Sequence, residues 1–408
     1  MPVAPNVIGA LLGVSSALLT ACATVPTAPS PVHAEVGVAF GRTGELASFA
    51  EGVADPQSGR RVTADDPVRV ASISKLVVAV GVMKLVERGR LELDSDVSRW
   101  LGWRLRNPAF PERPITLRML LSHTSSVRDH DDQYAIPLGR TVQATMADPR
   151  SWDAQHGPGD RYFTYGNMNF PIVGSIVERV TGERFDVWMR REVLEPMALD
   201  ACYNWPTCSD AAVARAVELD QGGKPAKDDL HGRRPDCPVL VEDGEPCDLG
   251  RWKLGENGSL FAPQGGLRTS ARGLARIGRM LLDGGTLDGV RIISGQSVDT
   301  LMKQVWRFDG ANGQTEKGFY CSFGLATQQI PTRAAGCADD MGTRGALLVG
   351  HAGDAYGMKA GLWLDRARGR GIAYFVTGVP DKAQRDDRSA FTAAEARAFR
   401  RTYALLPR

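Results

Sequence analysis

A serine and a lysine three positions apart are the first candidates for chemistry in this sequence. Ser72 and Lys75 lie in the segment ASISKLVVAVGVMK, where aliphatic side chains surround the lysine. A serine hydroxyl becomes a nucleophile when a neighbouring base takes its proton, and a lysine can be that base when its pKa is lowered. Burial among apolar side chains lowers the pKa of a lysine in this way. The pair is therefore a candidate for nucleophilic catalysis.

A helix that begins at Ser72 would hold the two side chains together. The spacing typical of a helix is seen in the positions of Ile73, Leu76, Val77, Val80 and Lys84. Positions three apart lie on one helix face, and the first turn presents free N–H groups that can stabilise an oxyanion. The pattern ends at Gly89, a typical C-terminal cap. Taken alone, the spacing also fits an N-capping serine beside a lysine that extends into solvent.

Two further short motifs follow in order along the chain. The first is YGN at residues 165–167, and the second is HAG at residues 351–353, between two β-prone runs. Tyrosine and histidine side chains can both transfer protons, although a single Tyr165 also fits a core aromatic and a single His351 fits a structural histidine. No G-x-S-x-G occurs, which excludes the nucleophile elbow of an α/β-hydrolase.

The segments around these motifs predict a sheet assembled from both ends of the chain. Two β-prone runs in residues 35–55 predict a hairpin, and three more lie between residues 345 and 379. The middle of the chain carries helical patterns. We therefore expect an α/β (α+β) fold, in which an antiparallel sheet flanked by helices carries an inserted, mostly helical subdomain.

The expected boundaries follow from the same patterns. Residues 35–104 and 266–408 would form the two parts of the α/β subdomain. Residues 105–265 would form the helical subdomain, mostly helical from about residue 115 to residue 181 and irregular in its cysteine-rich part, residues 200–260.

The N-terminus has the features of an export signal. The first 34 residues contain no charged side chain, and residues 7–19 are too short to span a bilayer but suit the apolar core of a signal. LTAC, which ends at Cys22, resembles a lipobox, whereas the overlapping ACA resembles an ordinary cleavage site. We expect a signal in residues 1–22, a linker in residues 23–34 and a periplasmic location. Lipidation of Cys22, with anchoring to the membrane, stays open.

Six further cysteines fall into three local pairs in stretches rich in turn residues. The pairs are Cys202 with Cys208, Cys237 with Cys247, and Cys321 with Cys337. Short disulfide-closed loops are typical of an oxidising compartment, and six unrelated buried thiols are the alternative. The sequence has no C-x-x-C or H-E-x-x-H and its histidines are scattered, so no metal site is expected.

The overall charge argues against one class of partner. The chain has 49 Lys and Arg against 47 Asp and Glu, with no long run of one sign. A nearly neutral balance offers no electrostatic footprint for nucleic acid. The sequence does not determine the oligomeric state.

The ordered motifs resemble those of the serine β-lactamase and penicillin-binding-protein superfamily. The resemblance is to the branch that holds class C β-lactamases, D-aminopeptidases, D-alanyl-D-alanine carboxypeptidases and family VIII carboxylesterases. That branch combines S-x-x-K, Y-x-N and a third motif of the K/H-x-G type in this order. The segments that match in kind include VRVASISK, ITLRMLLSHTSSV, GGLRTSARGLARIGRMLL and GHAGDAYGMKAGLWLD. The resemblance implies a β-lactamase/transpeptidase-like fold, from about residue 35 to the end.

The resemblance implies a role for each residue of the first two motifs. Ser72 would be the acylated nucleophile. Lys75 and Tyr165 would share the general-base work, with the Tyr165 phenolate favoured by the lysine cation. Asn167 would hydrogen-bond Lys75 or a substrate amide.

For the third motif, the resemblance implies substrate binding. The segment from His351 to Gly353 would line an edge strand that holds the substrate in extended form. The backbone N–H groups of Ser72 and Asp354 would form the oxyanion hole. His123 matches a recurrent histidine that we interpret as structural. No metal or organic cofactor is expected.

The third motif also bears on the substrate. β-Lactamases usually have K-T-G there, whose lysine offers a permanent cation to the drug's carboxylate, whereas His351 is mostly neutral near pH 7. Lys359 could supply a charge, but the sequence does not place it. We expect an exported serine hydrolase of small-molecule esters or amides, with at most weak β-lactam hydrolysis. A D-alanyl-D-alanine carboxypeptidase, a D-aminopeptidase acting on peptides and a class C-like β-lactamase are the alternatives.

A binding module without activity is the least favoured interpretation of the sequence. Loss of catalysis would be expected to alter at least one of Ser72, Lys75 and Tyr165. All three are present.

Overall fold

The computed structural model describes residues 33–227 and 229–407. The chain divides into a short unit, Met1–Ser30, and the unit Pro31–Arg408. The predicted export signal, most of the predicted linker and Cys22 lie outside the described residues. No helix in the described ranges is long and apolar enough to cross a membrane.

The chain forms sixteen short or medium strands among the described residues. The strands are β1 (Ala34–Gly41), β2 (Glu45–Asp55), β3 (Arg60–Arg61), β4 (Val68–Arg69), β5 (Cys202–Tyr203), β6 (Asp220–Gln221), β7 (Lys224–Pro225), β8 (Leu267–Thr269), β9 (Thr286–Leu287), β10 (Val290–Arg291), β11 (Trp306–Arg307), β12 (Ser322–Phe323), β13 (Gln328–Ile330), β14 (Leu348–Ala355), β15 (Met358–Asp365) and β16 (Arg370–Val376).

Most helices lie in the middle of the chain, and one more follows the last strand. The α-helices are α1 (Ile73–Glu87), α2 (Ser98–Leu101), α3 (Leu117–Leu121), α4 (Val142–Thr145), α5 (Asn169–Thr181), α6 (Phe185–Met189), α7 (Asp210–Arg215), α8 (Ala271–Leu282), α9 (Gly295–Met302) and α10 (Ala393–Tyr403). Short 3-10 turns are η1 (Pro149–Ser151), η3 (Glu195–Met197) and η4 (Leu249–Arg251), and η2 (Arg190–Leu194) is π-helical.

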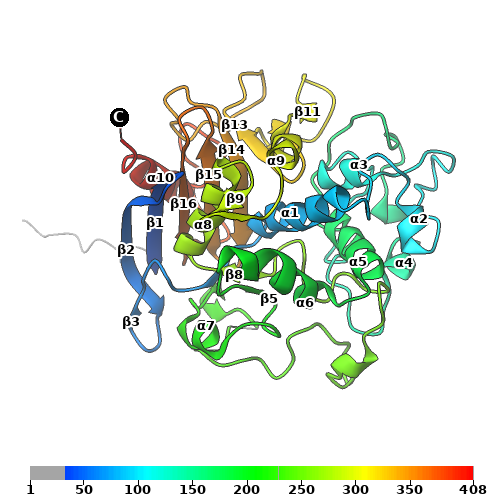
Figure 1. The fold of residues 1–408 in the computed structure, drawn as a ribbon, viewed down its shortest axis with the longest axis horizontal. Helices are drawn as coiled ribbons and strands as arrows, with labels where there is room; N and C mark the ends of the chain where they lie inside the picture. The colour runs from blue at the N-terminus through cyan, green and yellow to red at the C-terminus, as the bar shows by residue number, and fades with distance from the viewer. Residues whose placement is uncertain (1–32, 228, 408) are drawn as a thin grey trace, which may run out of the picture. The chain divides into compact units, whose positions relative to one another are not determined.

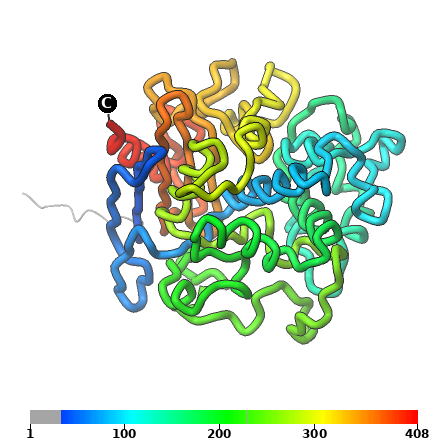
Figure 2. Tube along the Cα trace, viewed as in Figure 1, coloured from blue at the N-terminus to red at the C-terminus, as the bar shows by residue number. Residues whose placement is uncertain are grey.

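The main sheet joins the two ends of the chain, as the sequence predicts. Its nine strands follow the order β11-β12-β13-β14-β15-β16-β1-β2-β3. The N-terminal strand β1 pairs antiparallel with β2 on one side and with β16 on the other, with Gly37 opposite Tyr374. Figures 1 and 2 show the blue N-terminal hairpin beside the C-terminal strands. The expected antiparallel sheet with flanking helices is confirmed.

Two helices cover opposite faces of this sheet. Side chains alternate between the faces along a strand, and β1 follows this rule. Val38 and Phe40 belong to the same core cluster as Leu274 of α8. Ala39 belongs to a second cluster with Phe399 of α10. Helix α8 therefore packs on one face of the sheet and α10 on the other (Figure 1).

Helix α1 is buried along most of its length, as expected from its aliphatic sequence. It runs between the sheet and the helical part of the chain, and it contacts β14, β15, α9 and η2 (Figure 1). A helix that is apolar on all sides is stable only inside the protein. The sequence from Ser72 to Gly89 thus encodes the central element of the fold.

The segment between α3 and α5 is less helical than the sequence predicts. Helix α3 has only five residues, because Ser122 hydrogen-bonds back to the Arg118 carbonyl and His123 takes a left-handed φ of 57°. Such a residue ends a helix. Turns then connect α3 with α5, apart from α4 and η1.

The three predicted cysteine pairs are disulfides in the structure. Cys202 is bonded to Cys208, Cys237 to Cys247, and Cys321 to Cys337.

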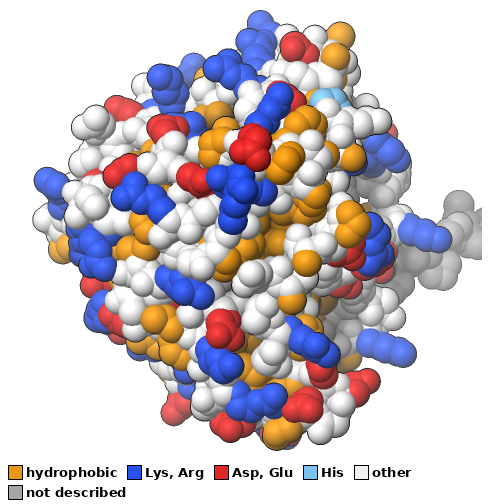
Figure 3. Space-filling model, turned by 90° about the vertical axis from the view of Figure 1, so that its right-hand side faces the viewer, with side chains coloured by type: hydrophobic (Ala, Val, Ile, Leu, Met, Phe, Trp, Pro, Cys, Tyr) orange, Lys and Arg blue, Asp and Glu red, His pale blue; other side chains and the backbone are white. Residues whose placement is uncertain are grey.

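The surface carries charges of both signs. Lys and Arg are interspersed with Asp and Glu on the face shown in Figure 3. No single-sign patch is visible on that face, in agreement with the near-neutral composition.

Candidate active site

Lys75 lies at the centre of the candidate site, in the first turn of α1. Its side chain is fully buried. Its Nζ donates hydrogen bonds to the Ser72 Oγ at 2.9 Å, the Asn167 Oδ1 at 2.8 Å and the Gln264 carbonyl oxygen at 2.8 Å. The Ser72 side chain makes no capping hydrogen bond. The alternative of an N-capping serine beside a solvent-exposed lysine is therefore wrong.

Neutral oxygens, and no carboxylate, hold the amino group of Lys75. Burial lowers the pKa of Lys75 to about 7, and the negative charge of Asp129 opposes this shift without forming an ion pair. A lysine in this state exchanges its proton near neutral pH, about three units below its usual range. The site therefore contains a base that is available under ordinary conditions.

The hydrogen-bond partners decide where the lone pair of a neutral Lys75 points. The oxygens of Asn167 and Gln264 can only accept hydrogen bonds, whereas the Ser72 hydroxyl can accept or donate. When Lys75 loses a proton, only the Ser72 contact can reverse its direction. The hydroxyl then donates to Nζ, which is the geometry that general-base activation requires.

Ser72 stands at the N-terminus of α1, where the chain turns out of β4. Ala71 has a φ of 47°, and among the described residues the Ser72 N–H makes no backbone hydrogen bond. Strand β14 approaches this turn closely, because a Cβ on Gly353 would lie 2.4 Å from the Val70 carbonyl oxygen. Glycine is needed at this contact. The contact brings the strand that carries Asp354 next to the Ser72 turn.

Tyr165 is stacked between two other rings. Its ring centroid lies 4.4 Å from that of His123 and 4.4 Å from that of Tyr320, and the Lys75 Nζ lies 5.1 Å from it. The phenol oxygen is buried and has no hydrogen bond of normal geometry. Burial raises the pKa of Tyr165, while the nearby Ser72 hydroxyl and Tyr320 partly oppose the rise. The direction is opposite to that expected for a phenolate, because burial is the largest influence on this group.

His351 is buried and neutral. Burial lowers its pKa to about 3, with a further contribution from the charge of Lys75. Its Nδ1 donates to the Ala352 carbonyl oxygen at 2.6 Å, and its Nε2 has no hydrogen-bond partner among the described residues. The imidazole is thus a neutral group beside the lysine, and it offers no cation to a substrate.

The third motif lies on a strand that is partly open at one side. Strand β13 pairs with β14 only at Leu348, Val349 and Gly350. The described residues provide no strand partner on that side from His351 to Ala355. Lys359 of β15 lies opposite Asp354 and forms an ion pair with it, so its charge is already compensated.

Three residues of the site were not predicted from the sequence. Asp129 accepts the backbone N–H groups of Asn167 at 2.6 Å and of Met168 at 2.9 Å, and it thereby positions the second motif. Gln264 contributes a backbone carbonyl, and Tyr320 contributes a ring face. These contacts depend on backbone groups and on packing, so no residue-type spacing in the sequence indicates them.

The immediate surroundings of Ser72 and Lys75 do not resemble a metal site. Their contacts are amide and carbonyl oxygens and the rings of Tyr165 and Phe170. In the described part of the chain, three potential metal ligands meet at Asp55, Glu218 and His231, and none of them contacts Ser72 or Lys75.

Comparisons with known proteins match most of this chain to one family. The family model named Beta-lactamase matches residues 31–396. Penicillin-binding protein 4 of Amycolatopsis lactamdurans is 29% identical over 265 residues, which cover 64% of this chain and 63% of that protein. Esterase EstB of Burkholderia gladioli is 30% identical over 171 residues, 38% of this chain and 42% of the esterase. The chain thus spans less than two thirds of the length of these two relatives.

Solved structures share the fold. The D-amino acid amidase from Ochrobactrum anthropi SV3, complexed with D-phenylalanine, superposes with a TM-score of 0.64 at 18% identity. The match covers 92% of this chain and 94% of the amidase. The octameric penicillin-binding protein homologue from Pyrococcus abyssi also gives a TM-score of 0.64, at 20% identity over 92% of this chain and 74% of that protein.

Proposed function

The chain belongs to the beta-lactamase family, and we propose that it is a serine hydrolase that forms an acyl-enzyme on Ser72. One observation carries the proposal. A fully buried Lys75, with its pKa lowered to about 7, hydrogen-bonds the Ser72 Oγ at 2.9 Å while its other contacts are acceptors only. This arrangement supplies the base that a serine nucleophile needs.

In the proposed mechanism, the Ser72 oxygen attacks the carbonyl carbon of an ester or amide, and its proton passes to the Lys75 Nζ. The backbone N–H groups of Ser72 and Asp354 receive the negative charge of the tetrahedral intermediate. The bond to the leaving group then breaks, the leaving group takes a proton, and the acyl-enzyme remains. A water molecule, activated by the same lysine, releases the acid and restores Ser72.

Tyr165 fits the role of proton donor in this scheme. Its raised pKa keeps the phenol protonated at neutral pH, and a protonated phenol can pass its proton to an alkoxide or amine as it leaves. The proton on Lys75 would then pass to the Tyr165 oxygen, which restores the neutral lysine that deacylation needs. Asn167 holds the Lys75 Nζ in place throughout.

Small neutral esters or amides are the proposed substrates. The third motif offers a neutral His351, and Lys359 is paired with Asp354. The carboxylates of Glu316 and Asp129 are close enough to raise the pKa of Tyr165 further. Negative charges near the site disfavour a substrate with a carboxylate, such as a β-lactam or a peptide that ends in D-alanine.

Amides with a free amino group are the second candidate. The same two carboxylates, on Asp129 and Glu316, would attract a substrate ammonium group near Tyr165. A D-aminopeptidase or D-amino-acid amidase activity would use this attraction. The substrate charge thus separates the candidates: neutral for an ester, positive for an amino-acid amide and negative for a β-lactam.

The three disulfides support an exported, periplasmic location. Disulfides persist in oxidising compartments and are rare in the cytosol.

Labelling with a fluorescent fluorophosphonate tests the nucleophile. The purified chain should be labelled, and Ser72→Ala should abolish the label. Ser74→Ala is the matched control, because Ser74 is also buried in α1 but its Oγ only accepts the Leu267 N–H at 3.0 Å. Labelling of Ser72→Ala at the wild-type level would overturn the proposed acyl-enzyme.

A substrate panel tests the proposed class. We expect p-nitrophenyl acetate to be hydrolysed faster than nitrocefin or a D-Ala-D-Ala peptide. Rates for D-alanine p-nitroanilide above those for the ester, with a loss in Glu316→Gln, would favour the second candidate. Nitrocefin as the best substrate would contradict both.

A further inference from the structure

Three side chains with metal-ligating atoms meet at the junction between β2 and the cysteine-rich part of the chain. Asp55 is the last residue of β2, Glu218 precedes β6, and His231 follows β7. Their ligand atoms all lie within 4.8 Å of one another. The His231 Nδ1 lies 3.1 Å from the Asp55 Oδ1 and also contacts the Glu218 Oε2. The three groups therefore converge on one point.

The two carboxylates of this cluster are buried, and the Gln57 N–H is a hydrogen-bond donor to Asp55 alone. Asp55 is 8% exposed and Glu218 is 9% exposed. Among the described residues, neither forms an ion pair with a lysine or an arginine. The Glu218 Oε2 is buried without a hydrogen bond of normal geometry, although it faces the imidazole. An oxygen in this state is costly unless a proton or a cation binds it, and burial raises the pKa of Glu218 to about 7.

A second histidine shows how an ordinary pair with an aspartate differs. The His156 Nδ1 lies 3.0 Å from the Asp153 Oδ2, much like His231 and Asp55. Asp153, however, is also bonded by the Arg128 guanidinium and by two backbone N–H groups. Its charge and its acceptors are satisfied, and no other carboxylate of the described residues joins this pair in a three-ligand cluster. Within the same residues, the cluster at His231 has a second carboxylate and no ion pair with an arginine.

Backbone hydrogen bonds hold the cluster in place. The Glu218 N–H donates to the Ala54 carbonyl oxygen at 2.8 Å, which fixes Glu218 beside Asp55. The Gln57 N–H donates to the Asp55 Oδ1 at 2.8 Å and orients that carboxylate. His231 lies at the surface, with its side chain 31% exposed. The donors are preformed, and an ion can reach them from solvent.

We propose that Asp55, Glu218 and His231 bind a divalent transition-metal ion, with Zn²⁺ as the expected occupant. One imidazole and two carboxylates form a donor set that suits Zn²⁺, whereas Ca²⁺ prefers oxygen ligands alone. Water would complete the coordination. The ion would fasten the segment that follows α7 to the end of β2, and it would take no part in chemistry at Ser72.

The sequence predicts no metal site, and the chain order of the ligands explains why. The ligands come from three separate segments, so no short motif contains two of them. Only the approach of residue 218 to the end of β2 brings the donors together.

Zinc titration of the full chain after chelator treatment tests the proposal. We expect isothermal titration calorimetry and elemental analysis to give one bound Zn²⁺ per chain, and zinc to raise the melting temperature. Glu218→Gln and His231→Ala should each weaken binding at least tenfold and remove the rise. His156→Ala is the matched control and should bind zinc as the wild type does.

Two outcomes would overturn the proposal. One is the absence of bound zinc. If His231→Ala is then less stable than the wild type only at low pH, the cluster is an imidazolium between two carboxylates. The other is equal binding by the wild type and both cluster variants. Because His231 is at the surface, His231→Ala is expected to fold even where Glu218→Gln does not. Binding is read independently of Ser72, so failure here leaves the hydrolase proposal untouched.

Discussion

Two buried cations in this protein are held in opposite ways. Lys75 in α1 is surrounded by neutral oxygens, whereas Arg268 in β8 is paired with a carboxylate. The same chain segment serves both residues, because Lys75 contacts the carbonyl oxygen of Gln264, four residues before Arg268. The same protein thus buries one cation among neutral acceptors and another beside a carboxylate.

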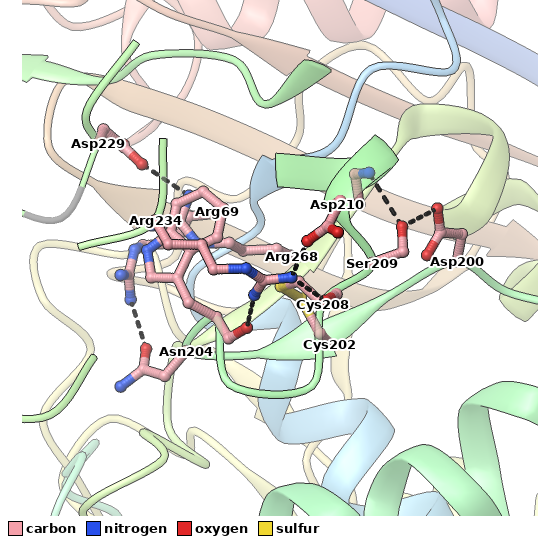
Figure 4. Close-up of a disulfide and its surroundings, with 12 residues drawn as sticks. Arg69, Asp200, Cys202, Asn204, Cys208, Ser209, Asp210, Asp229, Arg234 and Arg268 are labelled. Carbon is pink, nitrogen blue, oxygen red and sulfur yellow. Dashed lines mark hydrogen bonds and ion pairs between the residues drawn. A yellow bond between two sulfur atoms is a disulfide. The ribbon is translucent and has the colours of Figure 1, made fainter. Parts of the chain in front are cut away.

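Arg268 is a structural cation. It is 2% exposed, its Nη1 lies 2.7 Å from the Asp229 Oδ1, and its guanidinium lies 3.7 Å from the centroid of Trp205. Figure 4 shows Arg268 and Arg69 beside the Cys202–Cys208 disulfide. An arginine stays charged in proteins, and a paired one has no tendency to release a proton. Its contribution is to hold the cysteine-rich segment against β8.

Lys75 has the opposite environment and therefore a different capability. With no carboxylate in contact, burial destabilises its charged form, and its pKa falls to about 7. Burial alone therefore does not make a cationic side chain a catalytic base. Its pKa falls toward neutral pH only when no compensating anion is in contact with it.

Lys75→Arg should cause the largest effect. Arginine keeps the positive charge but cannot act as a base, so we expect acylation by a fluorophosphonate or by p-nitrophenyl acetate to fall roughly 10³-fold or more. Stopped-flow or burst kinetics would measure the change. Circular dichroism and thermal melting should show that the variant folds. Near-normal acylation would mean that the charge of Lys75 matters and its basicity does not.

Arg268→Leu should affect stability and leave the chemistry largely intact. Removal of one partner from a buried ion pair costs about 3–5 kcal/mol. Urea denaturation would measure this loss. The folded fraction should keep the wild-type kcat within a few-fold, because the hydrogen bonds that hold the Lys75 Nζ come from residues 72, 167 and 264. A large loss of kcat in folded protein would contradict a purely structural role for Arg268.

The pH profile should reveal the lowered pKa directly. The pKa of Lys75 is about 7, and only the deprotonated form can accept the Ser72 proton. We expect kcat/KM to be half-maximal near pH 7, to fall about tenfold per unit below it and to level off above it. His351 stays neutral over this range, because its pKa is about 3. A profile that rises only above pH 9 would contradict the lowered pKa.

Asp129→Asn should give the smallest effect, a shift of that profile. The Asp129 carboxylate raises the pKa of Lys75, so its neutralisation should move the midpoint to lower pH. The Asn167 backbone would also lose part of its support, so kcat should fall modestly. An unchanged midpoint would show that Asp129 acts only by holding the Asn167 backbone in place, without influence on the pKa of Lys75.

The sequence predicted more about some parts of the fold than about others. The strands of residues 34–55 and 348–376, and the helix after Ser72, carry strong periodic patterns, and all three form as expected. The segment between α3 and α5 was predicted to be more helical than it is. Its short apolar runs do not encode their ends, which depend on a left-handed His123 and a side-chain hydrogen bond from Ser122. The cysteine pairing was predicted because each partner lies close in sequence.

By itself, the sequence determined that a serine, a lysine and a tyrosine of family-like spacing are present, and that a sheet built from both ends would carry them. The tertiary structure decided what these groups can do. A pKa depends on what surrounds a group in space, and the oxygens around Lys75 come from residues 72, 167 and 264. The same is true of Tyr165, whose burial reverses the expected phenolate, and of the cluster at His231. Charge and solvation are properties of the folded surroundings, which no short motif contains.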